Sequence, residues 1–540
     1  MAEPDRLLDR IKAHYPTIRA LHVASGAPGL SLGVFHHSRI QHIAHFGRRA
    51  IDSPAAPNDD SVYGVASTFK IVTASAIAKL VADGVLGWDT PVRQYLAGLD
   101  RSDDFGRQAT VRDLLANRTG LPMASFYWGQ QNGEQLLDKS EFVALVNSIE
   151  LVKPFRSTFI YSQWNYALLH LIVESVTGKS FGAYVQEVIF DPLGLKTPTF
   201  DVPQGTNVMR HHANRNDGSA HEITTSPFDS ASGLAAGTGG KTSLRDQMHL
   251  YIALLHAYQH QTANNVDTTP NSPFTYLRTI FSPHIKFPGS TLDKQAYCLG
   301  VYRTQLPGNL SCASINSLLP RRDIPVFGAA EAPPLTEEIF HHTGNFPGGV
   351  GSMLLVPRTN SGVVVMANAT PSMDAPDFIA QILLSALLDT QPPPNLPSLS
   401  RKVIQMQTAI FDQAASMVES CKTDTPPSLP LPAYAGSYSN TLGNFKIVVT
   451  TRGSGLHVSV QGKPASTYDL VPCDGDTFSW AVDRDHEVVD RGMWINPLPQ
   501  FHVINFEVDG KCVRSLSWQH DRLMDAEVFL KAGEEAKSKL

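Results

Sequence analysis

Two proline-rich breaks divide this chain of 540 residues into regions that differ in how their apolar residues are spaced. Residues 391–397 read Gln-Pro-Pro-Pro-Asn-Leu-Pro, and residues 425–432 read Thr-Pro-Pro-Ser-Leu-Pro-Leu-Pro. Proline lacks a backbone N–H and fixes its own φ angle, so we interpret both stretches as linkers. The units that we expect are a large domain over 1–395, a helical linker over 396–432, a small domain over 433–532 and an exposed tail over 533–540.

The large domain mixes strand-like and helix-like patterns. Residues 30–36 and 362–368 are short apolar runs typical of interior strands. Residues 69–82 and 166–176 carry apolar side chains spaced for one buried helical face. Strands near both ends of the domain, with helices between them, predict an α+β body with a helical insertion.

The C-terminal region has a different period. Residues 400–421 have the pattern of one amphipathic helix, and beyond the second linker the chain alternates apolar and polar residues in short runs. Gly, Asp and Asn turns separate these runs, which predicts a small antiparallel barrel or sandwich. The predicted strands include residues 445–450, 456–460, 477–480 and 501–506.

Composition removes several classes of function. Lys and Arg total 44 against 50 Asp and Glu, which gives a net charge of −6. Because the chain is acidic and has no basic tract, we expect no nucleic-acid partner. No apolar run reaches the roughly 18 residues that cross a bilayer, and the first residues carry no secretory leader. The five cysteines are widely spaced and form no CxxC pair, which argues against a disulfide framework and against a zinc site made of thiolates. We expect a soluble intracellular protein with no membrane partner.

The last three residues are Ser538-Lys539-Leu540. This tripeptide is a peroxisomal address when it ends a chain, so it predicts peroxisomal localisation and a peroxisomal import receptor as a partner. It also implies a eukaryotic source. The alternative is chance, because a polar helical tail is often rich in Lys, Ser and Leu.

The strongest chemical feature is Ser67 at a predicted helix start, followed by Lys70. A spacing of three places both side chains on one helical face, and the helix N-terminus favours developing negative charge. A lysine in a poorly solvated pocket can lose its proton and then accept one from a serine hydroxyl. The alternative is a chance match in which Ser67 only caps the helix.

The Ser67 to Lys70 segment resembles the first motif of the superfamily of serine β-lactamases, penicillin-binding proteins and related esterases. The resemblance covers residues 25–390 and implies a β-lactamase-like body, with an antiparallel sheet and a helical subdomain. Residues 434–438 and 516–521 resemble the lipocalin-like barrel appended to some members. The flanking segments that fit the family are residues 80–92, 111–122, 190–195 and 239–246.

The family's second motif is Tyr-x-Asn, which Tyr161-Ser-Gln163 resembles. The resemblance makes Tyr161 the proton shuttle, a phenol whose pKa is lowered by the neighbouring cationic lysine. Gln163 is one methylene longer than the family's asparagine. It keeps an amide for substrate binding, but β-lactam turnover is not implied. The alternative for Tyr161 is a core tyrosine with one hydrogen bond.

The third motif, Lys-Thr-Gly or His-x-Gly, resembles His342-Thr-Gly344 on a predicted strand. The resemblance places His342 opposite Ser67, where it would hold charge or the Tyr161 hydroxyl. It also implies an oxyanion hole made by the backbone N–H groups of Ser67 and Asn345. The alternative is a surface histidine on a strand edge, with Gly344 in a bend.

These motifs imply a serine hydrolase that acts through an acyl-enzyme on an ester, thioester or amide of a small molecule, in secondary metabolism. No metal and no organic cofactor is expected. An acyltransferase would use the same machinery with another acceptor, and a non-catalytic binding protein could keep the same fold.

Two other patterns compete. Gly29 to Gly33 reads G-x-S-x-G around Ser31, but that motif needs a strand, a turn and a helix, whereas here the strand pattern continues. Two histidine groups lack zinc-enzyme spacing and carboxylate partners, so we expect solvated loops or sheet faces there. These groups are His36, His37, His42 and His45, and His211, His212 and His221.

The terminal barrel carries no family nucleophile or base, so we expect a supporting role. Our hypothesis is that it packs against the catalytic body and shapes the mouth of the pocket, limiting substrate size. An independent stability or dimerisation module is the alternative.

Overall fold

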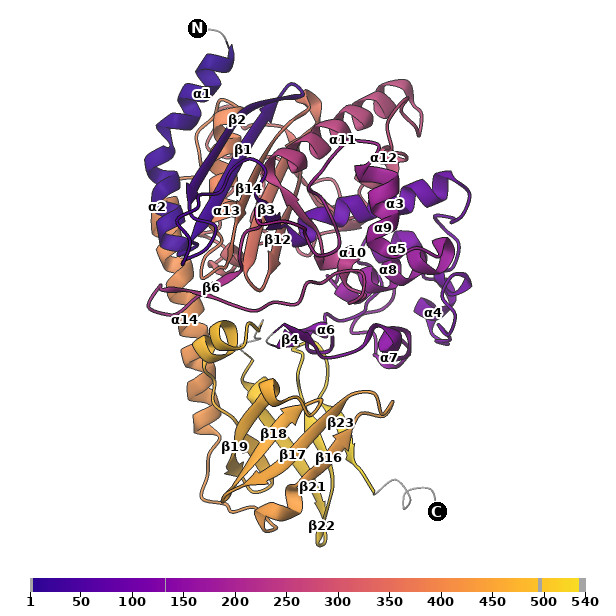
Figure 1. The fold of residues 1–540 in the computed structure, drawn as a ribbon, viewed down its shortest axis with the longest axis vertical. Coiled ribbons are helices and arrows are strands. Elements are labelled where there is room, and N and C mark those ends of the chain that lie inside the picture. The colour runs from indigo at the N-terminus through magenta and orange to yellow at the C-terminus, as the bar shows by residue number, and fades with distance from the viewer. Residues whose placement is uncertain (1–2, 132, 494–497, 534–540) are drawn as a thin grey trace.

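The computed structural model describes residues 3–131, 133–493 and 498–533 (Figure 1). An α+β body and a closed β-barrel are joined by helix α14 (Leu396–Ser420), as the predicted fold class requires. No helix in the described ranges is both long and apolar enough to cross a membrane. The tripeptide Ser538-Lys539-Leu540 lies outside the described residues.

The body is built on one antiparallel sheet of eight strands. The predicted strands at 30–36 and 362–368 are confirmed, and they pair with each other inside this sheet. In spatial order the strands are β2 (Arg39–Gly47), β1 (Gly29–His36), β14 (Ser361–Ala367), β13 (Gly349–Val356), β12 (Glu338–Phe346), β11 (Tyr302–Gln305), β10 (Gln295–Tyr297) and β9 (Ile285–Lys286).

Helices cover both faces of the sheet, so its central strands are apolar on both sides. In β14, Val363 and Val365 join one hydrophobic core, while Val364 and Met366 join the other. The first core lies under α1 (Glu3–Ala13), α2 (Tyr15–Ser25) and α13 (Ala375–Leu387), and the second lies under α11 (Leu244–Asn264) (Figure 1). In β1, a Cβ on Gly33 would lie 2.5 Å from Met248 Sδ of α11, so a larger residue there would require the Met248 side chain to move.

The helical subdomain lies beside the sheet and carries the confirmed predictions at 69–82 and 166–176. These are α3 (Lys70–Ala82) and α8 (Gln163–Thr177). Most side chains of α3 are buried on every side, as expected of a helix inside a large core. The other helices of this region are α4 (Asp104–Gln108), α5 (Val111–Leu115), α7 (Phe142–Ser148), α9 (Phe181–Val185), α10 (Ala235–Thr238) and α12 (Leu277–Phe281).

The C-terminal domain is a closed barrel in which each strand pairs with the next and the last with the first. Inward-facing aromatic side chains, including Tyr434, Tyr438, Phe478 and Phe506, fill it. Its strands are β16 (Gly436–Ser439), β17 (Lys446–Arg452), β18 (Gly455–Val460), β19 (Thr467–Asp474), β20 (Thr477–Ser479), β21 (Val503–Asp509), β22 (Cys512–Trp518) and β23 (Glu527–Lys531).

The first linker is shorter than predicted. Helix α14 begins at Leu396, so Pro397 is part of the helix and not of the linker. A proline is tolerated in the first helical turn, because its missing N–H has no partner there in any case. Leu396 and Val403 join the core beneath α13, which anchors the start of the connecting helix on the body.

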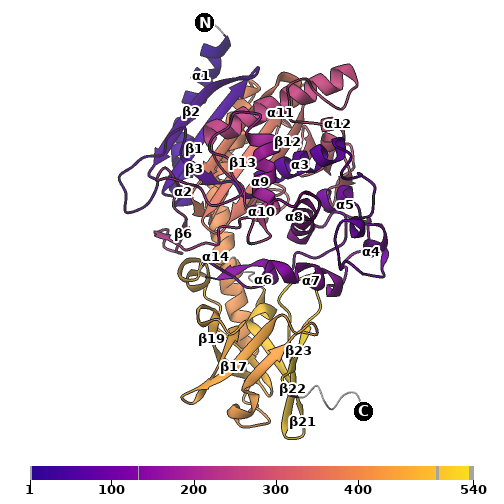
Figure 2. The same cartoon turned by 45° about the vertical axis from the view of Figure 1, so that its right-hand side comes forward.

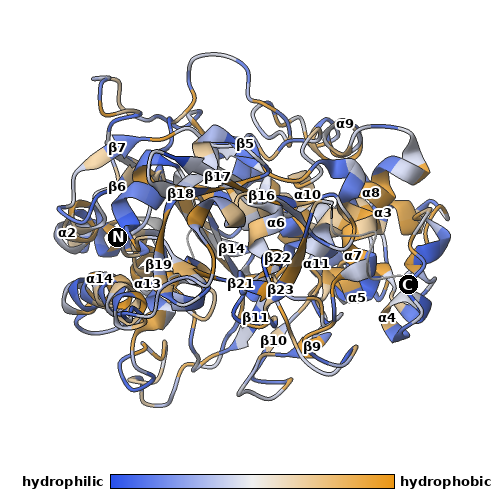
Figure 3. Cartoon of the chain, turned by 90° about the horizontal axis from the view of Figure 1, so that it is seen from below, coloured by the Kyte–Doolittle hydropathy of each residue, from blue (hydrophilic) through white to orange (hydrophobic). Residues whose placement is uncertain are grey.

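The body closes one end of the barrel with the short helix α6 (Ser125–Trp128), which lies at the boundary of the two parts (Figures 2 and 3). The ring of Phe126 lies 4.4 Å from Trp518 and 5.6 Å from Phe501, centroid to centroid. Beside it, the N–H of Ala124 donates to Asp521 Oδ2 at 2.9 Å, and the Tyr127 hydroxyl donates to Glu527. The ring of Phe126, which we call the aromatic plug, thus completes the barrel core from the side of the body.

A second contact joins residues 484–493 of the barrel to the body. The Arg484 guanidinium is 5% exposed and donates to the carbonyl of Asn214 at 2.7 Å. Val488 and Val489 pack against Ile223 in a small shared core. The barrel is therefore packed onto the body at several places, these two among them, which agrees with the docking that the sequence suggested.

Replacing Phe126 with alanine tests the plug. We expect Phe126→Ala to lower the free energy of unfolding by about 3–5 kcal/mol, because it leaves a cavity among aromatic rings. The control Leu442→Ala removes an exposed barrel side chain and should change stability by less than about 0.5 kcal/mol. Urea unfolding measures both, and an unchanged midpoint for Phe126→Ala would show that α6 only rests against the barrel.

Candidate active site

Ser67 lies in a strained turn between β3 (Val62–Gly64) and α3. It belongs to a 3-10 helix, Ala66–Phe69, that runs directly into α3, so Ser67 lies at the start of the helical segment, as predicted. Ala66 has a φ angle of +43°, which is costly for a residue with a side chain. The N–H groups of Val65 and Ala66 both donate to the carbonyl of Gly240, which holds the turn in place.

Lys70 is fully buried, and its polar contacts in the described part of the chain are all uncharged. Its Nζ lies 2.5 Å from the carbonyl of Gly237, 3.0 Å from Oε1 of Gln163 and 3.2 Å from Oγ of Ser67. Loss of water around the amine lowers the pKa of Lys70 well below its usual value. A neutral amine is compatible with these contacts, because two N–H bonds can donate to the carbonyl oxygens of Gly237 and Gln163 while the nitrogen lies within hydrogen-bond distance of Oγ of Ser67.

The hydroxyl of Tyr161 donates to Oγ of Ser67 at 2.8 Å. Burial raises the pKa of Tyr161, and the hydrogen bond with Ser67 only partly offsets this effect. The prediction of a lowered phenol pKa is therefore wrong, because burial disfavours a phenolate and also keeps Lys70 neutral. Tyr161 stays protonated and acts here as a hydrogen-bond donor.

Asn117 fixes the segment that carries Tyr161. Its carbonyl accepts from the N–H of Ile160 at 2.9 Å, and its Oδ1 accepts from the N–H of Ser162 at 3.1 Å. Its Oδ1 also accepts from Nδ2 of Asn165 on α8 at 2.9 Å. Asn117, from the segment 111–122, thus fixes the backbone on both sides of Tyr161, and we call these contacts the Asn117 bracket. The sequence of the segment alone did not indicate this role.

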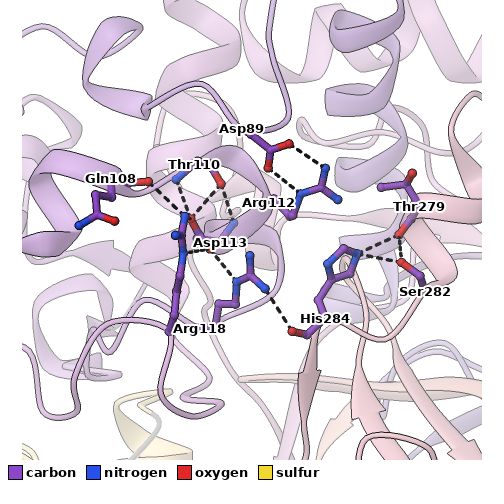
Figure 4. A network of polar contacts seen from close by, with 10 residues as sticks. Asp89, Gln108, Thr110, Arg112, Asp113, Arg118, Thr279, Ser282 and His284 are labelled. Atoms are coloured by element: carbon purple, nitrogen blue, oxygen red, sulfur yellow. Dashed lines mark hydrogen bonds and ion pairs between the residues drawn. The ribbon is translucent and has the colours of Figure 1, made fainter.

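A buried ion-pair network holds this bracket (Figure 4). The carboxylate of Asp113 is fully buried and accepts from Arg118 at 2.6 Å and from Arg156 at 2.7 Å. Burial alone would raise the pKa of Asp113, but the hydrogen bonds and charges of both arginines outweigh it, and the pKa lies below its usual value. Arg118 also donates to the carbonyl of His284 at 3.2 Å, which ties the bracket to the edge of the sheet.

His342 lies on β12, near Ser67 but bonded elsewhere. Its Nδ1 lies 2.6 Å from the carbonyl of Thr343, and its Nε2 lies 3.3 Å from the hydroxyl of Tyr297. Burial, with a smaller contribution from Lys70, lowers the pKa of His342 to about 3. The predicted roles for His342 are therefore corrected: it is neutral, and the hydroxyl that it contacts is that of Tyr297, not Tyr161. Tyr297 belongs to none of the sequence motifs, and only the pairing of the strands in the sheet brings it next to His342.

The end of β12 beside Ser67 provides a free backbone donor. A two-residue turn joins β12 to β13, so Phe346 and Gly349 form a hydrogen-bonded pair and Asn345 takes the next, non-bonded position. The N–H of Asn345 therefore points away from β13. On that side the described sheet offers no partner, because β11 pairs with β12 only as far as His341.

Gly344 lets the strand and the serine turn approach each other. A Cβ at Gly344 would lie 2.1 Å from the carbonyl of Val65, so any larger residue would push the two apart. Gln163, the first residue of α8, uses its amide oxygen to hold Lys70, so that oxygen is not free for a substrate as the sequence suggested.

The competing sequence patterns do not form a second centre. Ser31 is fully buried in the middle of β1, and its Oγ lies 2.7 Å from the Tyr63 hydroxyl and 2.8 Å from Nδ1 of His45. His45 continues to Oδ1 of Asp59 at 2.9 Å. No group of three His, Cys, Asp or Glu side chains placed to hold a metal ion occurs within the described ranges.

The residues 13–387, which include the whole site, match the family named Beta-lactamase. The chain belongs to the Beta-lactamase family. Its C-terminal part, residues 421–532, matches a domain of unknown function, DUF3471. The resemblance predicted from the three motifs is thus confirmed, and the barrel follows the family's body.

Relatives of this Beta-lactamase family chain include hydrolases. The "Unguisins hydrolase ungD" of Aspergillus violaceofuscus is 23% identical over 500 residues, covering 84% of this chain and 80% of the relative. A "Putative D-alanyl-D-alanine carboxypeptidase" of Escherichia coli is 31% identical over 188 residues, covering 32% and 43%. The octameric penicillin-binding protein homologue of Pyrococcus abyssi shares the fold, with a TM-score of 0.56 and 19% identity over 97% of this chain and 99% of that one.

Asn117 provides a test of the bracket. Asn117 has a φ angle of +52°, which glycine also adopts, so Asn117→Gly keeps the backbone conformation and removes only the side-chain bonds. We expect kcat to fall about 100-fold through displacement of Tyr161, with a smaller change in KM.

Asn360→Gly is the matched control, since Asn360 has a φ angle of +44° and its amide bonds to Ile252, away from the site. Steady-state kinetics of both variants with an activated ester measures the effect. Equal kcat values for the two variants would show that Asn117 does not position Tyr161.

Proposed function

We propose that this protein hydrolyses an acyl bond of a small molecule through an acyl-enzyme on Ser67. The observation that carries the proposal is the buried Lys70, whose Nζ lies 3.2 Å from Oγ of Ser67 and whose pKa is lowered by burial. A neutral amine at this distance can accept the hydroxyl proton as the oxygen attacks a carbonyl carbon.

In the first step the Ser67 oxygen bonds to the substrate carbonyl carbon, and its proton passes to Lys70. The N–H groups of Ser67 and Asn345 would stabilise the oxyanion, because both lack a partner in their own element. The bond to the leaving group then breaks, and Tyr161 gives its proton to that group. Lys70 returns a proton to Tyr161, which leaves the acyl-enzyme and a neutral lysine.

In the second step water attacks the acyl carbon and gives a proton to the neutral Lys70, because Tyr161 is already protonated. The bond between Ser67 and the acyl group breaks, the serine oxygen recovers its proton, and the carboxylic acid leaves. His342 stays neutral and holds Tyr297, so it supports the pocket wall and carries no charge.

We propose an amide or ester of a peptide-like small molecule as the substrate, of the kind found in secondary metabolism. The relative that covers most of this chain is named as an unguisins hydrolase, which supports hydrolysis. The bacterial relative is named as a putative D-alanyl-D-alanine carboxypeptidase, and this name supports a peptide-like bond. If an alcohol or amine replaces water in the second step, the same acyl-enzyme yields acyl transfer.

Substitution of the nucleophile tests the proposal. Incubation with an activated ester should add one acyl group to Ser67, visible by mass spectrometry of the intact chain and its peptides, and Ser67→Ala should show neither adduct nor turnover. Ser75→Ala is the control, because Ser75 is a buried serine on α3 whose hydroxyl bonds only to the helix backbone at Ile71.

Repeating the incubation with added alcohols and amines compares transfer with hydrolysis by the ratio of products. Turnover by Ser67→Ala at the rate of the parent enzyme would contradict the proposed function.

A further inference from the structure

A cavity of about 310 Å³ lies beside the turn that carries Ser67. Its walls come from β3, from the segment 202–211, from the segment 222–228 and from the end of β12. The residues used below are Tyr63, Val202, Val208, Ile223, Phe228 and Phe346.

The cavity shares its wall with the catalytic turn. Gly64, which lines it, is three residues before Ser67, and Gly240, which also lines it, accepts the N–H groups of the turn. Thr238, a third lining residue, follows Gly237, whose carbonyl accepts from Lys70. The cavity therefore borders the turn that carries Ser67.

Strand β12 sets the direction in which a bound substrate must extend. His342, Gly344 and Phe346 alternate onto one face, each about 7 Å from the next. Gly344 packs against the serine turn, and Phe346 lines the cavity beyond it. At the other end, the ring of His342 lies 6.1 Å from that of Tyr161.

A leaving group must lie beside its proton donor, Tyr161, and hence at the His342 end of the strand. The acyl group is bonded to the opposite side of the carbonyl carbon. It therefore extends toward Phe346 and the cavity.

The polar side chains around the cavity are bonded to one another or to neighbouring protein groups. This leaves apolar surface for a ligand, including the rings of Tyr63, Phe228 and Phe346. The pairs are the Tyr63 hydroxyl with Ser31 at 2.7 Å, Nδ1 of His211 with Thr225 at 2.5 Å, Nζ of Lys241 with the carbonyl of Pro227 at 2.5 Å, and Arg210 with Glu222 at 3.0 Å.

We infer that this cavity binds an uncharged apolar acyl group, aromatic or branched aliphatic, of the substrate that Ser67 attacks. The inference rests on the proposed function and deepens it. A cavity of roughly 150 Å³ holds a benzene ring, so this one accepts an aromatic side chain with its linking carbons.

The barrel braces one wall of the cavity. Ile223 lines the cavity on one side and packs against Val488 and Val489 of the barrel on the other. A Cβ on Gly492 would lie 2.6 Å from the carbonyl of Thr224, so the two segments are in direct contact. Phe228 lines both this cavity and a narrow crevice to which the barrel contributes Phe501. The barrel thus sets the position of the wall that limits acyl size.

The test compares p-nitrophenyl acetate with p-nitrophenyl 3-phenylpropionate. We expect the parent enzyme to favour the phenylpropionyl ester by about ten-fold or more in kcat/KM. Val208→Trp places a large side chain at the cavity wall and should remove about ten-fold of this preference, measured as the ratio of the kcat/KM values of the two esters. Val202→Trp, at a side chain that is 51% exposed, repeats the test where folding is not at risk.

Val23→Trp is the matched control, because Val23 is 78% exposed on α2 and does not line the cavity. The double variant Val488→Ala with Val489→Ala tests the brace, and it should weaken the preference in the same way while acetyl-ester turnover is retained.

The outcomes separate the two proposals. Acylation of Ser67 with an unchanged ester preference in both tryptophan variants would overturn the cavity assignment alone. An unchanged preference in the double alanine variant would overturn the bracing role. No acylation of Ser67 by either ester would overturn the proposed function and this assignment with it.

Discussion

The site depends on keeping a lysine amine dry. Lys70 is fully buried, and two carbonyl oxygens, from Gly237 and Gln163, take its N–H bonds. Burial lowers the pKa of Lys70 well below its usual value, which favours the neutral amine that a base requires. The same lack of water raises the pKa of Tyr161 and lowers the pKa of His342.

The rest of the body can be understood as the frame for this pocket. The strained turn at Ala66 aims Ser67, the Asn117 bracket aims Tyr161, and Gly344 permits β12 to approach both. Each contact joins elements that are far apart in the chain, so the site exists only when the sheet and the helical subdomain are packed together. Through Phe126 and Ile223 the barrel joins the same packing.

Sequence patterns predicted the elements whose physical cause is local. The strands at 30–36 and 362–368 and the helices at 69–82 and 166–176 follow from apolar spacing, and the motif residues Ser67, Lys70, Tyr161 and Gln163 do meet. Partners that depend on packing were beyond the sequence. Gly237 and Tyr297 carry no pattern, and the direction of the Tyr161 pKa depends on burial that a motif does not reveal. The helix predicted over 400–421 starts four residues after α14 begins at Leu396, because Pro397 was interpreted as a break and not as a first-turn residue.

The most direct test of the neutral lysine is the rate of Ser67 acylation as a function of pH, measured by rapid quenching and mass spectrometry. A neutral base is lost when it is protonated, so the rate should fall as the pH drops through the lowered pKa of Lys70 and stay constant above it. Tyr161, with its raised pKa, should add no second limb in the neutral range. The control Lys79→Met, at a lysine near the end of α3 that pairs with Asp83, should leave this profile unchanged. A rate that keeps rising up to the ordinary lysine pKa of about 10.4 would show that Lys70 is charged in the resting enzyme, and would contradict the account.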